Sequence, residues 1–151
     1  MRFIVVGGLA GSIWGSPVAT FDVDVFAPMT DENLERIHRA MQGINARFRM
    51  RPDKLPLFED PARLHGFRNL NFDTDLGRLD ILGELTGVGT YEEVEAMSVS
   101  MKLDDIDLKV IDLDTLILAK QAAGRDKDRY AVVHLEAIRR LRQQSPPDQS
   151  H

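Results

Sequence analysis

The chain has 151 residues, of which 43% are hydrophobic and 28% are charged, and its formal net charge is −5. This length allows one domain with a sizeable core, and the acidic balance argues against a general nucleic-acid-binding protein, which would be strongly basic. Cysteine is absent, which excludes disulfides and thiolate metal sites, and no apolar run is long enough to span a bilayer. We therefore expect a cytoplasmic protein with no membrane partner.

The first half of the chain alternates between apolar runs and breaker residues. Two strands around a short helix are expected here: Phe3–Val6, the helix at residues 9–15, and Ala19–Phe26. An amphipathic helix then begins at Thr30 or Asp31, because apolar residues recur at steps of three and four: Leu34, Ile37, Met41, Ile44 and Phe48. Residues 49–66 contain three prolines and no sustained period, which indicates a loop with room for one short turn.

The second half predicts two hairpins and then helices. The hairpin strands are Leu70–Asp73 with Arg78–Leu82, and Val99–Leu103 with Leu108–Ile111. Between the hairpins, Thr90-Tyr91-Glu92-Glu93 has the form of a capping box and should begin a short helix. A largely buried helix is expected at Leu113–Ala123 with Gly124 as its stop, followed by a last helix from Asp126 to about Gln143.

Strands and helices are therefore mixed along the chain, and neither a repeat nor an interdomain linker separates them. This order predicts an α/β or α+β fold, with helices packed on a mixed β-sheet and a helical C-terminus. Residues 1–144 are expected to form a single domain, and residues 145–151 (SPPDQSH) a polar, disordered tail.

Three carboxylates lie in predicted strands and are the candidates for chemistry. Asp22 and Asp24 are two positions apart, so their side chains should share one face, with Val23 and Val25 directed into the core. Asp80 is flanked by apolar residues in a later strand. Carboxylates this close repel each other unless a cation lies between them, and Mg²⁺ or Mn²⁺ is the cation such oxygens suit. If the strands are neighbours, the three acids could form a two-metal site.

A glycine pair supplies a complementary feature. Gly7-Gly8 lies between a strand and a helix start, where exposed backbone N–H groups favour a phosphate. Neither the phosphate-loop pattern nor the dinucleotide-binding glycine pattern is present. Each feature alone also has a plain structural explanation, a solvated strand face or a tight turn, and only their combination is specific.

That combination resembles the nucleotidyltransferase superfamily with the DNA-polymerase-β-like core. Its signature is a small-residue pair after a strand, a short helix, Asp-X-Asp in the next strand and a third acid later; here Gly8 and Asp22 have thirteen residues between them. More narrowly, the chain is similar to small bacterial abortive-infection and type IV toxin–antitoxin nucleotidyltransferases. The similar segments lie between about residues 3 and 128: VVGGLAGSIWGSPVATFDVDV, NFDTDLGRLDILGELTGVGTYEEV and LDTLILAKQAAGRDKD.

The resemblance implies roles for individual residues. Asp22, Asp24 and Asp80 would be catalytic metal ligands, and Asp80 would also be a base for the acceptor hydroxyl. The nucleotide would be bound by residues of the three similar segments: Gly7, Gly8, Thr20, Lys120, Arg125, Lys127 and Asp128. For Lys120 the alternative is snorkelling from a buried helix, and for the last three residues it is a capped, charged helix end.

The implied activity is Mg²⁺-dependent transfer of a nucleoside monophosphate from an NTP to a hydroxyl of an RNA (tRNA) end, a protein or a small molecule. An antitoxin-like protein partner is a further expectation. The alternative is a non-catalytic module of the same fold that binds nucleotide or a protein. Two departures from the group favour this alternative: the chain starts directly at the first strand, without the group's preceding helix, and Ala131 stands where a second acid is common.

Overall fold

The strands form one seven-stranded mixed sheet in a computed structural model that describes residues 1–49 and 55–144. The sheet order is β3-β4-β5-β2-β1-β7-β6. β2 runs parallel to β5 and β1 parallel to β7, whereas the other neighbours are antiparallel. The strand bounds are β1 Ile4–Val6, β2 Asp22–Phe26, β3 Arg47–Phe48, β4 Asn69–Thr74, β5 Gly77–Leu82, β6 Val99–Leu103 and β7 Ile106–Val110.

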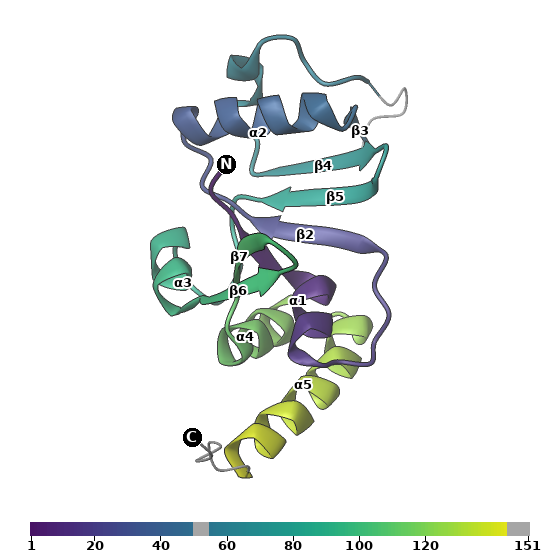
Figure 1. The fold of residues 1–151 in the computed structure, drawn as a ribbon, viewed down its shortest axis with the longest axis vertical. Coiled ribbons are helices and arrows are strands. Elements are labelled where there is room, and N and C mark those ends of the chain that lie inside the picture. The colour runs from purple at the N-terminus through teal and green to yellow at the C-terminus, as the bar shows by residue number, and fades with distance from the viewer. Residues whose placement is uncertain (50–54, 145–151) are drawn as a thin grey trace.

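Helices cover the sheet at two places (Figure 1). The helix α2 lies along the β3–β4–β5 end, whereas α1, α4 and α5 gather near β1 and β7. The bounds are α1 Gly7–Trp14, α2 Asp31–Gly43, a 3₁₀ turn at Pro61–Leu64, α3 Tyr91–Met97, α4 Leu113–Ala123 and α5 Asp126–Gln144. The expected mixed α/β class with a helical C-terminus is confirmed. Within the described ranges, no helix is long and apolar enough to cross a membrane.

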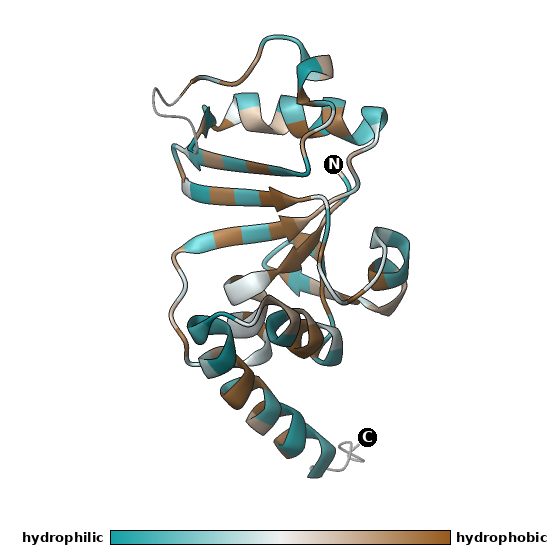
Figure 2. Cartoon of the chain, turned by 180° about the vertical axis from the view of Figure 1, so that it is seen from behind, coloured by the Kyte–Doolittle hydropathy of each residue, from teal (hydrophilic) through white to brown (hydrophobic). Residues whose placement is uncertain are grey.

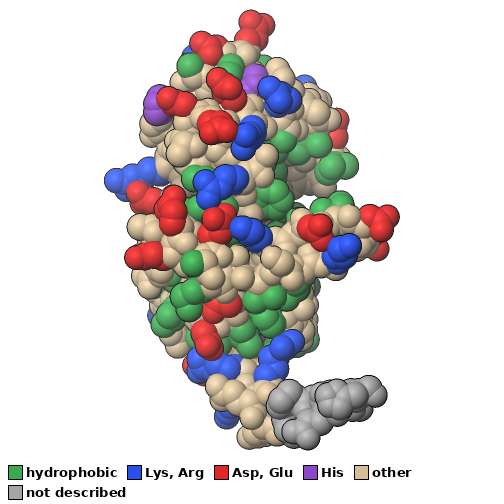
Figure 3. Space-filling view, turned by 60° about the vertical axis from the view of Figure 1, so that its left-hand side comes forward, with side chains coloured by type: hydrophobic (Ala, Val, Ile, Leu, Met, Phe, Trp, Pro, Cys, Tyr) green, Lys and Arg blue, Asp and Glu red, His purple; other side chains and the backbone are tan. Residues whose placement is uncertain are grey.

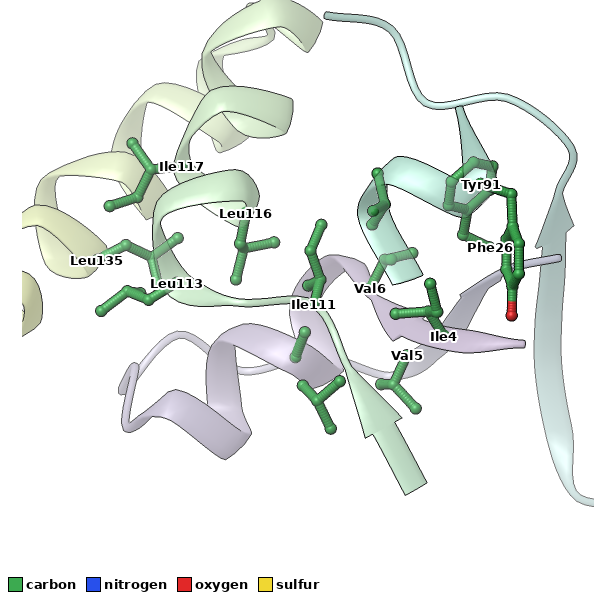
Figure 4. Close-up of a cluster of buried hydrophobic side chains, with 13 residues drawn as sticks. Ile4, Val5, Val6, Phe26, Tyr91, Ile111, Leu113, Leu116, Ile117 and Leu135 are labelled. Carbon is green, nitrogen blue, oxygen red and sulfur yellow. The ribbon is translucent and has the colours of Figure 1, made fainter. Parts of the chain in front are cut away.

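Hydrophobic and hydrophilic residues alternate along the strands (Figure 2), and the buried side chains form two separate clusters. One cluster lies under α2 and includes Val25, Leu70, Phe72 and Ile81 from three neighbouring strands. The other is built around β1, with helices α1, α3, α4 and α5 contributing to it (Figure 4). The residues of β2 and β5 that alternate with Val25 and Ile81 point to the opposite face, and these include Asp24 and Asp80.

The predicted end of the first long helix is wrong. α2 stops at Gly43, Asn45 adopts a left-handed φ of 53°, and Phe48 lies in β3 as the partner of Phe72. Ile44 and Phe48 match the helical period although both lie beyond the helix. Their side chains still pack into the cluster under α2. The region expected to be a loop from residue 49 is therefore preceded by an unpredicted edge strand.

The region between β1 and β2 also differs from expectation. α1 begins at Gly7, two residues before the predicted helix, and β2 begins at Asp22 rather than Ala19. Val25 is buried as expected, but Val23 is 37% exposed and lies outside both clusters. Only the later part of β2 is therefore buried in the core, and the first residues of β2 are partly exposed.

The second half follows the sequence closely. Both hairpins form, although β7 begins at Ile106 because Asp104, with a φ of 55°, tightens the turn. Thr90 and Glu93 make the capping box of α3, and Gly124 ends α4 with a φ of 64°. The expected tail at 145–151 lies outside the described residues.

Candidate functional site

A row of side chains crosses the sheet at the level of Asp24. Asp24 is the register partner of Asp80 on β5 and of Val6 on β1, and Asp80 is in turn the partner of Asn71 on β4. The backbone N–H of Arg49, the residue after β3, donates to the carbonyl of Asn71 at 3.0 Å, so Arg49 lies at the end of this row. Two of the three predicted acids, Asp24 and Asp80, therefore lie side by side, as neighbouring parallel strands require.

The glycine pair lies at the N-terminus of α1, directly against the strand that carries the acids. Gly7 has a φ of 64°, and a Cβ atom there would lie 2.3 Å from Asp24 Oδ2. A Cβ atom on Gly8 would lie 2.7 Å from Thr20 Oγ1. Only glycine allows this approach, so the backbone of the helix start reaches the carboxylate and hydroxyl at contact distance.

A cavity of about 350 Å³, which we call the first cavity, opens at this junction. Its lining combines the helix start with acidic, basic and hydroxyl side chains, and it brings together eight of the ten predicted site residues: Gly7, Gly8, Thr20, Asp22, Asp24, Lys120, Arg125 and Lys127. Asp80 and Asp128 are the two predicted residues outside this lining. Ala131 also lines the cavity, at the position where the resemblance led us to look for an acid.

The environment of Asp24 favours its protonated form. Burial and then the neighbouring Asp80 carboxylate raise the pKa of Asp24 to about 6, although the charge of Lys120 acts in the opposite direction. A cation that binds beside such a carboxyl group stabilises its charged form. The electrostatics therefore favour a cation beside Asp24.

Asp80 is engaged by an arginine that sequence reasoning missed. The Arg49 guanidinium forms an ion pair with the Asp80 carboxylate and donates to the Phe72 carbonyl at 3.2 Å, and both charged side chains are mostly buried. Among the described residues, no group of three acidic or histidine side chains could hold a metal ion together. The third acid of the expected three-carboxylate site is therefore paired with Arg49 in this arrangement.

The start of α5 is tied to α4 through a buried carboxylate. Asp128 is fully buried and lies 2.6 Å from Arg125 Nε and 3.6 Å from Lys120 Nζ. Burial acts to raise the pKa of Asp128, but the hydrogen bonds and charge of Arg125 and the charge of Lys120 lower it below its ordinary value. Asp128 therefore holds the two cations in place at the cavity rather than facing a ligand in the first cavity itself.

The lining also includes residues that were not predicted, and two of them bear on ligand binding. Arg78 is the register partner of Asp22 on β5 and adds a cation, and Phe21, 93% exposed, lies at the rim. Arg78 could have been found by extending the β2–β5 pairing two residues back from Asp80. Arg49 could not, because it lies in the region predicted to be a loop and the strand just before it, β3, was taken for the end of a helix.

Of the comparisons with known proteins, the one with solved structures shows the fold. No protein-family model matches the sequence, and no curated protein matches it. A solved structure does: a lincosamide antibiotic adenylyltransferase, LnuA, with lincomycin bound, is similar with a TM-score of 0.60 and 10% sequence identity. The match covers 91% of this chain and 87% of the LnuA chain. The chain therefore has a nucleotidyltransferase-like fold.

Proposed function

We propose that this protein is a nucleotidyltransferase that moves a nucleoside monophosphate from an NTP to a hydroxyl acceptor. The observation that carries the proposal is the first cavity: Gly7 at the start of α1 lies against Asp24, with Asp22 and four basic side chains around the same space. Amides at a helix start and basic side chains suit phosphates, and paired carboxylates suit the divalent cation that accompanies them. The nucleotidyltransferase-like fold supports the same function.

The reaction needs both substrates at one carboxylate pair. The acceptor oxygen forms a bond to the α-phosphorus, the bond from that phosphorus to the β-phosphate oxygen breaks, and pyrophosphate leaves with the electron pair. The hydroxyl proton passes to a neighbouring base, for which we keep Asp80. Mg²⁺ or Mn²⁺, when bound, would neutralise the phosphate charge, and Asp22 and Asp24 would hold it. Asp80 can take part only when Arg49 releases it.

For the acceptor, we favour a small molecule. LnuA is an antibiotic adenylyltransferase with a small molecule bound, and its fold is shared over most of both chains. The net charge of −5 also disfavours a polynucleotide, and on the face in Figure 3 basic side chains are interspersed with acidic ones. An RNA end or a protein hydroxyl, with an antitoxin-like partner, remains the prediction of the narrower resemblance.

The test is release of pyrophosphate and transfer of label from α-labelled NTPs to an acceptor pool of RNA, protein and small molecules. We expect Mg²⁺-dependent transfer that the Asp22→Ala/Asp24→Ala variant loses. Asp105→Asn, an exposed acid in the β6–β7 turn, is the matched control and should transfer normally. Equal turnover by the wild type and the double variant would contradict the proposal.

The second candidate is a non-catalytic module that binds nucleotide. The Arg49–Asp80 ion pair favours it, because it occupies the third acid that catalysis would use. Such a module would bind Mg²⁺–NTP at the first cavity and yet release no pyrophosphate with any acceptor. This candidate is supported over the enzyme if the wild type binds NTP without turnover and the Arg49→Ala variant also shows no turnover.

A further inference from the structure

A second cavity lies on the other side of Asp24. Its volume is about 360 Å³, and it shares four lining residues with the first cavity: Gly7, Asp24, Lys120 and Arg125. The remaining lining comes from the end of β5, the segment after it and α4, together with Val6 of β1 and Asp128 of α5. The two spaces therefore meet at one carboxylate, which is the geometry that a reaction between two separate substrates requires.

The two cavities differ in charge. The first lining has four basic side chains against the two carboxylates of Asp22 and Asp24. The second has two basic side chains, Lys120 and Arg125, against three carboxylates, those of Asp24, Glu84 and Asp128. The first cavity is therefore suited to a polyanion, and the second to a neutral or cationic molecule.

The second cavity is also largely apolar. Leucine and alanine side chains make up much of its wall: Leu82, Leu85, Leu116, Ala119, Ala122 and Ala123. Glu84 and Thr86 add polar groups from the segment that follows β5. An apolar wall with a few placed polar groups is typical of a small-molecule site, and the volume lies at the lower end of the range for such sites.

The lining of the first cavity offers contacts for the phosphates and the base of an NTP. Its phosphates would lie at Gly7-Gly8 with Arg78 and Lys127, and its base at the rim, where the exposed Phe21 ring offers a stacking surface. The second cavity then remains for the molecule that receives the nucleotide. Its position beside Asp24 places an acceptor oxygen next to the carboxylates.

We propose that the second cavity is the acceptor subsite and that it takes a small, mostly apolar compound with a hydroxyl near Asp24 and an amino group near Glu84. This inference rests on the proposed nucleotidyl transfer. The hydroxyl oxygen bonds to the α-phosphorus and pyrophosphate departs, as written above. The amine takes no part in the bond changes and serves only to orient the acceptor.

The experiment fills the second cavity and measures both substrates separately. Ala119→Phe and Ala123→Phe place a ring into it, and Ala123 is exposed, so that variant should fold normally. Leu118→Phe is the matched control, because Leu118 is a 52% exposed residue of the same helix outside the lining. Mg²⁺–NTP binding is measured by calorimetry, and transfer is measured with an α-labelled NTP and an aromatic amino alcohol, phenylalaninol, beside its amine-free analogue 3-phenylpropanol.

We expect the filled variants to bind NTP within about twofold of the wild type and to lose transfer to phenylalaninol by about tenfold or more. Glu84→Gln should remove the preference for the amine. Loss of NTP binding in the filled variants would overturn the inference, because the nucleotide would then occupy this space. Undiminished transfer by those variants, or wild-type NTP turnover that never uses phenylalaninol, would also overturn it. If the wild type binds no NTP at all, the proposed function itself fails.

Discussion

Gly7 joins the start of α1 to Asp24, and its backbone admits no other residue without strain. Its φ is 64°, and a Cβ atom would overlap the Asp24 carboxylate at 2.3 Å. We expect Gly7→Ala to lower the free energy of unfolding by about 1–3 kcal/mol, measured by urea denaturation. Gly43→Ala is the control, because a Cβ atom there meets nothing within 4 Å, and it should change stability little. A Gly7→Ala protein as stable as the wild type would contradict this close approach.

Asp24 should make stability depend on pH in the direction opposite to an ordinary paired carboxylate. Its pKa is raised in the folded state to about 6, so the folded protein holds this proton more tightly than the unfolded chain. Its contribution to stability is present below about pH 4 and is lost as the pH rises towards 6.

The substitution that isolates this contribution is Asp24→Asn. Without divalent cations at pH 7.5, the variant should be more stable than the wild type by about 1–2 kcal/mol, and the difference should shrink towards pH 4. Added Mg²⁺ should stabilise only the wild type if Asp24 holds the cation. A variant that is less stable at pH 7.5 would show that Asp24 is not under electrostatic stress. Thermal unfolding monitored by circular dichroism measures both effects.

Asp128, at the start of α5, contacts Lys120 of α4 and so connects the two helices. Asp128 is fully buried, and its pKa is lowered, so its stabilising contribution is present at neutral pH and is lost as the pH falls below about 4. Asp128→Asn should cost about 2–4 kcal/mol at pH 7, and the cost should decrease as the pH falls below 4 and towards the lowered pKa of Asp128, measured by urea denaturation. Asp126→Asn, whose side chain is 99% exposed, is the control and should cost less than about 1 kcal/mol. Similar costs for the two variants would contradict the buried network.

The edge strand β3 is connected to β5 by the Arg49–Asp80 ion pair. Arg49→Ala leaves a mostly buried carboxylate without its partner, and we expect a loss of about 1–3 kcal/mol in urea denaturation without divalent cations. Because Asp80 is then available to a cation, Mg²⁺ should raise the melting temperature of this variant more than that of the wild type. Arg47→Ala, an exposed neighbour, should show neither effect. No change in stability in Arg49→Ala would rule out the ion pair.

Elements with local signals could be predicted, and elements that depend on distant contacts could not. Thr90 and Glu93 are sufficient to predict the start of α3, because both capping hydrogen bonds are formed within four residues. β3 has only two residues and exists because Phe48 pairs with Phe72, twenty-four positions later. Its apolar residues also matched a helical period, so periodicity alone favoured the wrong element.

At the scale of the whole molecule, the site was partly visible in the sequence. Two residues on one strand must share a face if one separates them, so Asp22 and Asp24 could be placed together from the sequence alone. The pairing of β2 with β5 puts Asp80 beside Asp24, as the family resemblance led us to expect. The Arg49 contact and the second cavity depend on how β3, α4 and α5 pack, and no local pattern encodes that packing.

Calorimetric titration with each NTP and Mg²⁺ decides whether the first cavity binds a metal–nucleotide complex. We expect Mg²⁺-dependent binding by the wild type that the Asp22→Ala/Asp24→Ala variant loses, while Asp105→Asn retains it. Absence of binding at millimolar nucleotide, or equal binding by the double variant, would contradict this expectation.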